Sequence, residues 1–470
     1  MNTQEVLFHA PDASFSVTMR SQLHSFVAPL VKELDFFIDC RLVRTLVAAV
    51  EAILTFRNRP QGLLLSELGG YLLSPEHAPA GTKRLSNLLR CDKWDHKRIG
   101  RFLWERAGRR LEELEAQEEE ALLLWDASVL EKPESIKAEG LCAVRSSKAA
   151  RLKRIKPGFY NPPGGRPIFV PGVHWLAVMI AGLSSKSGAA QVATMQWWTT
   201  RGEHATDVRT LQAKVLAWCA KQWKRRVLHV FDRGYAGHFW LSWLAYYHAR
   251  FVLRWPKGYK LIALTKEGTP QPRADAKEQI EGRAAWKLAT GKKAWDKKQL
   301  YDTHTKEQRT IAVLALPVRH PQLAMPLWLV IARSGHGREP WYLLTGERVE
   351  TKEEAWKIYF TYHRRWQVEM AFRFNKCELG MESPRLWTWE RRLKLLSLVT
   401  LAYAFLLCLL NPGLHALIES LLKHFCHRTG KRSRETSAPL YRLRAALSRL
   451  WLAFPRHPAS GTQAYTMNPG

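Results

Sequence analysis

The order of apolar and amphipathic segments divides the chain into a helical first part and a second part of mixed α/β character. Residues 1 to about 115 are rich in helix formers with short breaks between them. From about residue 119, apolar runs typical of buried strands alternate with amphipathic stretches typical of helices. The runs are 121–128, 174–183, 191–200, 226–237 and 250–258, and the helices are 205–223 and one that begins at Phe239. Three strands followed by helix, strand, helix and strand indicate an α/β sheet with strands of mixed direction.

A second β-rich segment interrupts this pattern between residues 259 and 346. It contains the apolar runs 310–318, 326–335 and 340–346, and the helical pattern resumes at Thr351. The simplest account is an insertion within the α/β domain.

The longest nearly apolar run extends from Leu395 to Leu410. It has 16 residues and contains Ser397 and Thr400, whereas a membrane-spanning helix needs about 20 apolar residues. We therefore expect a buried core helix, and no membrane partner. The amino terminus has neither an early basic cluster nor an apolar stretch of the signal-peptide type, which predicts a cytoplasmic protein.

The charge of the chain indicates a polyanionic partner. There are 72 Lys and Arg residues against 42 Asp and Glu, a formal net charge of +30. Self-repulsion of this size opposes compaction, so it is typical of proteins that bind nucleic acid or an anionic membrane. The content of hydrophobic residues, 46%, is enough for real cores and excludes disorder as the main state.

The basic residues gather in three stretches. Ten lie between Lys83 and Arg110, seven between Lys137 and Lys156, and nine between Lys423 and Arg456. In the first stretch we expect Lys83, Arg84 and Arg90 to contact DNA phosphates ahead of a second basic amphipathic helix, although a solvated basic face is the alternative. In the second, which reads as a mobile basic loop, the candidates are Lys148, Arg151, Lys153 and Arg154.

The seven cysteines are scattered and include no Cys-x-x-Cys pair. This argues against a disulfide framework and against a structural zinc site, so we expect reduced and mostly buried thiols.

Two aspartates occupy positions where an isolated charge is costly. Asp126 closes the apolar run LLLWD, and Asp232 closes VLHVFD, so each stands at or near the end of a buried strand. A buried carboxylate must be paired, hydrogen-bonded or bound to a cation, because burying it alone costs several kcal/mol. The alternative for each is a cap on the helix or turn that follows.

A third acid lies on a helix expected at residues 353–380. One face of this helix carries four polar side chains: Tyr362, Arg365, Glu369 and Lys376. At about 100° per residue the four fall within about 60° of one another, which is not the pattern of a hydrophobic seam.

Two strand-end aspartates and a helical glutamate are what two-metal phosphoryl transfer requires. Carboxylates hold two divalent ions roughly 4 Å apart, one activating the attacking oxygen and the other stabilising the leaving oxygen. Such hard oxygen ligands favour Mg²⁺ or Mn²⁺ over zinc. Arg365 and Lys376 would then bind the phosphates beside the scissile bond.

These residues resemble those of a known family, the DDE transposases with an RNase H-like core. Within it, the insertion-sequence group that includes the transposon-five transposase carries a signature of Tyr, two residues, Arg, three residues, Glu, six residues and Lys. The segment YHRRWQVEMAFRFNK matches this Tyr-Arg-Glu-Lys signature. The resemblance extends to FDRGY at the second aspartate, to DASVLEK at the first, and to a β-rich insertion before the glutamate.

The resemblance implies roles for particular residues. Asp126, Asp232 and Glu369 would form the catalytic, metal-binding triad with two Mg²⁺ or Mn²⁺ ions, and the other signature residues would hold the DNA strand end. Trp341 takes the position of a tryptophan that stacks on a flipped base. The first aspartate matches most loosely, so Glu131 and Asp207 are its alternatives.

The same resemblance implies a domain layout. The expected segments are a helical DNA-end-binding domain (1–115), an RNase H-like core in two parts (116–258 and 347–412), a β-rich insertion (259–346), and a basic helical region that pairs two subunits (413–470).

The implied activity is cut-and-paste transposition of double-stranded DNA with terminal inverted repeats. The steps are end nicking, hairpin formation and opening, and joining to target DNA, carried out by a homodimer on the bacterial nucleoid. A nuclease that does not join ends and an inactive transposase-derived regulator are the alternatives.

Overall fold

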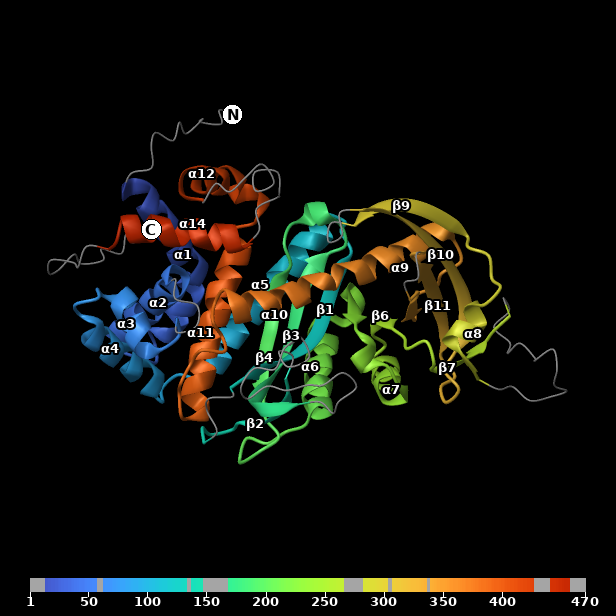
Figure 1. The fold of residues 1–470 in the computed structure, drawn as a ribbon, viewed down its shortest axis with the longest axis horizontal. Coiled ribbons are helices and arrows are strands. Elements are labelled where there is room, and N and C mark those ends of the chain that lie inside the picture. The colour runs from blue at the N-terminus through green and yellow to red at the C-terminus, as the bar shows by residue number, and fades with distance from the viewer. Residues whose placement is uncertain are drawn as a thin grey trace.

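The computed structural model describes residues 13–56, 62–132, 137–146, 168–265, 282–302, 307–335, 339–426 and 440–456. Its first part is helical, as expected, and lies to the left in Figure 1. The helices of this part are α1 Ala13–Leu34, α2 Cys40–Thr55, α3 Leu65–Leu72, α4 Ala78–Arg90 and α5 His96–Ala116. Asp39 and Asp95 cap α2 and α5 by accepting hydrogen bonds from backbone N–H groups of the first turn.

The described strands form one twelve-stranded sheet. Its core strands are β1 Ala121–Glu131, β2 Cys142–Arg145, β3 Phe169–Gly182, β4 Gln191–Trp198, β5 Val227–Phe231 and β6 Arg250–Arg254. Strands β1, β5 and β6 are parallel to one another, whereas β3 is antiparallel to β1 and to β4. The expected α/β sheet of mixed direction is therefore confirmed.

The β-rich segment does not form a sheet of its own. Its strands are β7 Lys260–Ala263, β8 Arg283–Ala284, β9 Asp296–Asp302, β10 Glu307–Arg319, β11 Pro326–Arg333 and β12 Trp341–Thr345, with the short helix α8 Ala285–Ala289. Strand β12 pairs antiparallel with β6, so the order continues as β5-β6-β12-β11-β10. The segment extends the same sheet to the right in Figure 1.

Alternating residues of the strands face two separate cores. Leu122, Leu124 and Val230 pack with helices α9 Lys352–Arg364, α10 Trp366–Cys377 and α11 Trp389–Cys408. Leu123 and Val227 pack with the end of α5 and with α6 Val208–Trp223, α7 His238–Tyr246 and α8. Figure 1 shows α9 and α10 as a long orange rod across one face of the sheet. The period of two along each strand thus decides which helices a side chain meets.

The carboxy-terminal helices return to the amino-terminal ones. They are α12 His415–Phe425 and α14 Leu440–Ala453. Arg444 of α14 donates to the carbonyl of Phe56, and Ser448 donates to that of Thr55 at 2.6 Å. The apolar face of α14 is therefore buried within this chain.

Helix α11 confirms the expected core helix, because its residues from Leu393 to Leu407 are buried. No single helix in the described ranges is long and apolar enough to cross a membrane; only α11 and Pro412–Phe425 together, bent by 75°, have the required length and composition. All seven cysteines lie in the described ranges and none forms a disulfide. The expectation that most are buried is wrong, since only Cys142 and Cys219 are.

Three other expectations need correction. The strand at Asp126 does not end there but runs on to Glu131, because β3 stays paired with it along its whole length. Part of the expected basic loop is strand β2, paired with the first residues of β3. The helix expected at 353–380 is two helices that meet at Arg365, where the N–H of Arg365 donates to the carbonyl of Tyr362 at 3.0 Å, a tighter turn than an α-helix makes.

Candidate active site

Strands β1 and β5 place the two aspartates side by side. The parallel register pairs Leu124 with Val230, and each aspartate lies two residues beyond this pair. Because side chains two residues apart share a face, Asp126 and Asp232 point to the side covered by α9 and α10. Strand β5 ends at Phe231, so Asp232 begins the turn at the carboxyl end of that strand.

Helices α9 and α10 bring the signature residues onto this face. Helix α9 begins with a capping box in which Thr351 accepts from the N–H of Glu354 and the Glu354 carboxylate accepts in return. At its other end, the hydroxyl of Tyr362 donates to Oδ1 of Asp232 at 3.1 Å. One signature residue is thereby fixed on the second aspartate.

Arg365 joins the other two acids. Its Nη1 donates to Oδ2 of Asp126 at 2.9 Å, and its Nη2 donates to Oε1 of Glu369. The arginine is only 8% exposed. Its position at the junction of α9 and α10 lets one planar guanidinium bridge a strand carboxylate and a carboxylate of its own helix.

The electrostatics follow from this crowding. Burial raises the pKa of Asp126 to about 6, and the nearby Glu369 and Asp232 add to the shift, while Arg365 and the N–H of Ala127 oppose it. Burial disfavours the charge on Arg365, but the surrounding Tyr362, Asp126 and Glu369 outweigh it and raise the pKa of the guanidinium. The three acids therefore lie within electrostatic reach of one another.

Lys376 and Trp341 complete the group. Nζ of Lys376 donates to Oγ of Ser128 at 2.8 Å, and Ser128 shares its face of β1 with Asp126. The half-buried ring of Trp341, at the start of β12, lies 5.0 Å from the ring of Tyr362 in an edge-to-face arrangement. The guanidinium of Arg254 lies over both rings, at 5.4 and 5.9 Å.

The donors suit a divalent cation by their chemistry, since three carboxylates supply hard oxygen ligands. Among the described residues, however, no group of three or more His, Cys, Asp or Glu side chains is placed to hold a metal ion as it stands. Arg365 occupies the space between Asp126 and Glu369. A cation that bound all three acids would have to take over contacts that the guanidinium now makes.

The alternatives to Asp126 have other partners. Asp207 caps α6 by accepting from the N–H groups of Arg209 and Thr210. Glu131 is buried and accepts from Oγ of Ser146 at 2.9 Å.

Three of the basic candidates lie on α4, in the helical part at the left of Figure 1. Lys83, Arg84 and Arg90 are exposed on α4. Lys148, Arg151, Lys153 and Arg154 lie outside the described residues. Two arginines of α5 contact α1 and do not form part of a free basic surface. Arg98 pairs with Glu33 at 2.7 Å, and the guanidinium of Arg106 lies over the ring of Phe26.

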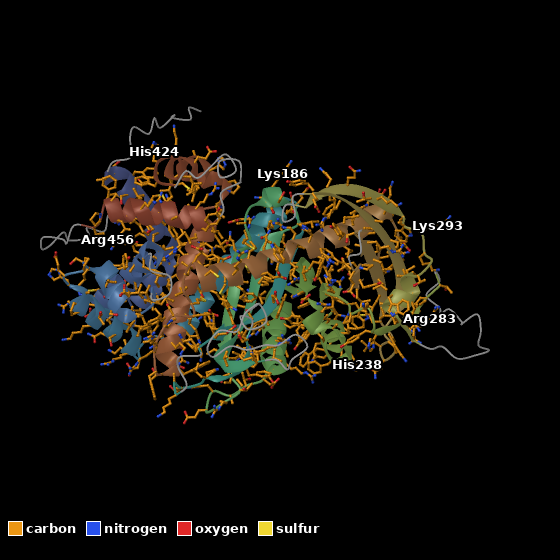
Figure 2. The ribbon with its side chains drawn as sticks, viewed as in Figure 1. Lys186, His238, Arg283, Lys293, His424 and Arg456 are labelled. Carbon is orange, nitrogen blue, oxygen red and sulfur yellow. The ribbon has the colours of Figure 1, made fainter. Side chains whose placement is uncertain are left out.

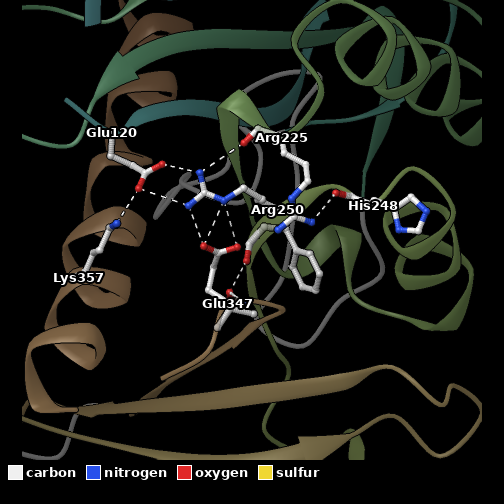
Figure 3. Close-up of polar contacts among 8 residues, drawn as sticks. Glu120, Arg225, His248, Arg250, Glu347 and Lys357 are labelled. Atoms are coloured by element: carbon white, nitrogen blue, oxygen red, sulfur yellow. Dashed lines mark hydrogen bonds and ion pairs between the residues drawn. The ribbon is translucent and has the colours of Figure 1, made fainter. Parts of the chain in front are cut away.

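A cluster of charged side chains, unforeseen from the sequence, ties α9 to the sheet (Figure 3). Arg250, at the start of β6, binds Glu120 at 2.8 Å and Glu347 at 2.7 Å, and Lys357 of α9 binds Glu120 at 2.6 Å. The four residues come from four places in the chain: before β1, on β6, after β12 and on α9. The cluster therefore fixes α9 relative to the strands that carry the aspartates.

Sequence reasoning also missed Ser128 and Arg254. Ser128 could have been predicted, because a polar residue two positions after a buried strand aspartate lies on the same face of the strand. Arg254 gave no local signal, since the pairing of β6 with β12 brings it to Trp341.

Comparison with solved structures shows a remote similarity to a transposase. No family model matches the chain, and no curated protein matches it. Among solved structures, the chain is similar to piggyBac transposase in its synaptic complex with hairpin DNA, with 14% identity and a TM-score of 0.40, covering 94% of this chain and 80% of that one. Superposition at this level is too loose to assign function, which rests on the residues described above.

Proposed function

We propose that the chain is a DDE-type DNA transposase of the insertion-sequence group with the Tyr-Arg-Glu-Lys signature. The observation that carries the proposal is the meeting of Asp126, Asp232 and Glu369 around Arg365, with Tyr362 on the second aspartate. These five side chains come from recognisable sequence features: three belong to the Tyr-Arg-Glu-Lys signature, and the two aspartates close the apolar runs LLLWD and VLHVFD.

The fold agrees with an RNase H-like core in which a mixed sheet is covered by helices on both faces. In the proposed layout, residues 1–115 read the DNA ends, 116–258 and 347–412 form the catalytic core, 259–346 are the insertion, and 413–470 pair two subunits. The proposed homodimer assembles on two DNA ends in the bacterial cytoplasm.

The proposed cofactor is Mg²⁺ or Mn²⁺, two ions per site, held by Asp126, Asp232 and Glu369. When bound, the ions would activate the attacking oxygen and neutralise charge on the leaving oxygen of a phosphodiester. Water at the nicking step and a 3′-hydroxyl at the joining step both need this activation. A single site could therefore serve every step of the proposed reaction.

The chain's own residues position the DNA. Arg365 has two donors on carboxylates, and its planar fork suits a phosphate equally well. A phosphate that drew the guanidinium away would free Asp126 and Glu369 for a cation. Lys376, beside Ser128 on the same face, supplies a second positive charge. Trp341 stands next to Tyr362 at the edge of the group, where stacking on a flipped base offsets part of the unstacking cost.

The test uses the DNA that flanks the gene. Fragments bearing its candidate terminal repeats are incubated with the protein, Mg²⁺ and a target plasmid, and products are separated on denaturing gels. Joined products support the transposase. Nicks without joining indicate a nuclease, and binding without cleavage indicates a regulator, so either result would overturn the proposal.

A further inference from the structure

The outer face of α7 carries a run of exposed aromatic rings. Phe239 is 42% exposed and Tyr246 is 74% exposed. Both lie against Trp243, with ring centroids 6.1 and 6.4 Å from it, and Trp243 stacks on Tyr247 at 5.7 Å. Trp243 and Tyr247 pack against the core beneath, so they form a fixed base on which Phe239 and Tyr246 stand out to solvent.

The surroundings of these rings are strongly basic. Residues 208–249, which include α6, β5 and α7, contain seven Lys and Arg residues, of which Arg226 is paired with Glu115, and one acid, Asp232. The guanidinium of Arg209, at the start of α6, lies 5.2 Å from the centroid of Phe239. On the exposed side of α6, Nζ of Lys214 lies 5.6 Å from the ring of Trp218. Each of the two helices therefore carries an exposed ring with a cation close to it.

This face is distinct from the candidate active site but begins beside it. Helix α7 starts six residues after Asp232. It packs on the sheet face opposite to the one covered by α9 and α10. Figure 2 shows its first residue, His238, at the lower edge of the molecule.

We propose that the face formed by Phe239, Trp243, Tyr246 and Arg209, here called the α7 face, binds single-stranded DNA. The proposal rests on the proposed function for the identity of the nucleic acid. Exposed rings and cations together match a strand whose bases are unstacked: each base offers a flat π-face to a ring, and each phosphate offers a charge to arginine or lysine. Duplex DNA keeps its bases stacked inside and cannot use the rings.

The charge of the α7 face decides against a protein partner as its occupant. Helix α7 contains no acid, and the guanidinium of Arg209 lies over the ring of Phe239. A DNA strand is negatively charged along its whole length, so it matches this acid-free face better than a protein surface of mixed charge does.

The experiment measures binding of a fluorescent oligo-dT and of a hairpin duplex by anisotropy, with the full chain in EDTA so that cleavage plays no part. We expect Phe239→Ala and Tyr246→Ala each to weaken oligo-dT binding about tenfold while leaving duplex binding unchanged. Tyr246→Trp should retain binding, because it keeps a ring. The matched control is Tyr441→Ala on α14, which removes a ring that is 50% exposed with Arg442 beside it and should change nothing.

Two results would overturn the inference and leave the proposed function standing: duplex binding without oligo-dT binding by the wild type, or unchanged oligo-dT binding by both alanine variants. A wild type that binds neither DNA contradicts the proposed function itself. Stacking on the α7 face is supported if two results are obtained together. The affinities for oligo-dT and for duplex both fall with salt, and the alanine variants lose affinity for oligo-dT alone.

Discussion

The guanidinium of Arg365 lies 2.9 Å from the carboxylate of Asp126, from Nη1 to Oδ2, while its Nη2 binds Glu369. One cation thus holds together acids from a strand and a helix that are 243 residues apart in sequence (369 − 126). Where three carboxylates meet, such a counter-charge stabilises the site until something else neutralises it. The arginine is therefore both a support for the acids and a competitor of any cation they bind.

Replacing Arg365 by Gln should strengthen metal binding while impairing reaction on DNA. Removing a unit charge within about 4 Å of the acids favours a divalent cation, and we expect Mn²⁺ affinity without DNA to rise about tenfold or more. Calorimetry measures it, with Arg373→Gln, an exposed arginine on the same helix, as control. Weaker Mn²⁺ binding by Arg365→Gln would show that the guanidinium does not compete.

Tyr362→Phe removes the hydroxyl that donates to Asp232 and leaves the ring in place. Because hydrogen bonds to charged groups contribute about 1.5–3 kcal/mol, we expect the single-turnover rate of DNA cleavage to fall about tenfold or more. The control is Tyr441→Phe, an exposed tyrosine on α14. A rate equal to that of the wild type means that the hydroxyl plays no part in positioning Asp232.

Arg250→Met should destabilise the protein by about 2–3 kcal/mol. The substitution leaves the partly buried Glu347 without its arginine, and leaves Glu120 with Lys357 as its remaining cation. Urea unfolding measures the loss. Arg348→Met removes an exposed arginine paired with Glu350 at 2.8 Å and should cost less than about 1 kcal/mol. Equal costs for the two variants would rule out the cluster as the anchor of α9.

The raised pKa of Asp126 predicts that the stability difference between the wild type and Asp126→Asn depends on pH when EDTA removes divalent cations. Burial raises the pKa of its carboxyl to about 6 from 3.8, so between these values the folded chain binds more protons than the unfolded one, and stability falls as pH rises through this window. Against Asp126→Asn, the wild type should lose roughly 2–3 kcal/mol between pH 4 and pH 6 and no more above pH 7. A constant difference across this range contradicts the burial of an ionisable Asp126.

The acids were predictable from the sequence because their signals are local. Asp126 and Asp232 each follow an apolar run, and the helical period placed Arg365 and Glu369 on one face. The mixed sheet followed from the same alternation of strands and helices.

The remaining features depend on contacts that no local pattern encodes. The continuation of the sheet from β6 to β12 needs the partner strand, which lies 87 residues on (341 − 254). The position of Arg365 between two acids depends on the junction of α9 and α10 and on a long flexible side chain. The basic stretch from Lys83 to Arg110 includes Arg98 and Arg106, and charge alone does not distinguish a solvated cation from one that packs on a neighbouring helix.

In the proposed transposase, Asp126, Asp232 and Glu369 together support metal-dependent cleavage of DNA. The most direct measurement is the cleavage rate of end-bearing DNA in Mg²⁺ by the wild type, Glu369→Gln and Glu353→Gln, the last an exposed glutamate on α9. We predict that Glu369→Gln reduces the rate at least about a hundredfold, since a lost metal-binding carboxylate removes several kcal/mol of transition-state stabilisation, while Glu353→Gln cleaves as the wild type does. Full cleavage by Glu369→Gln would contradict the account.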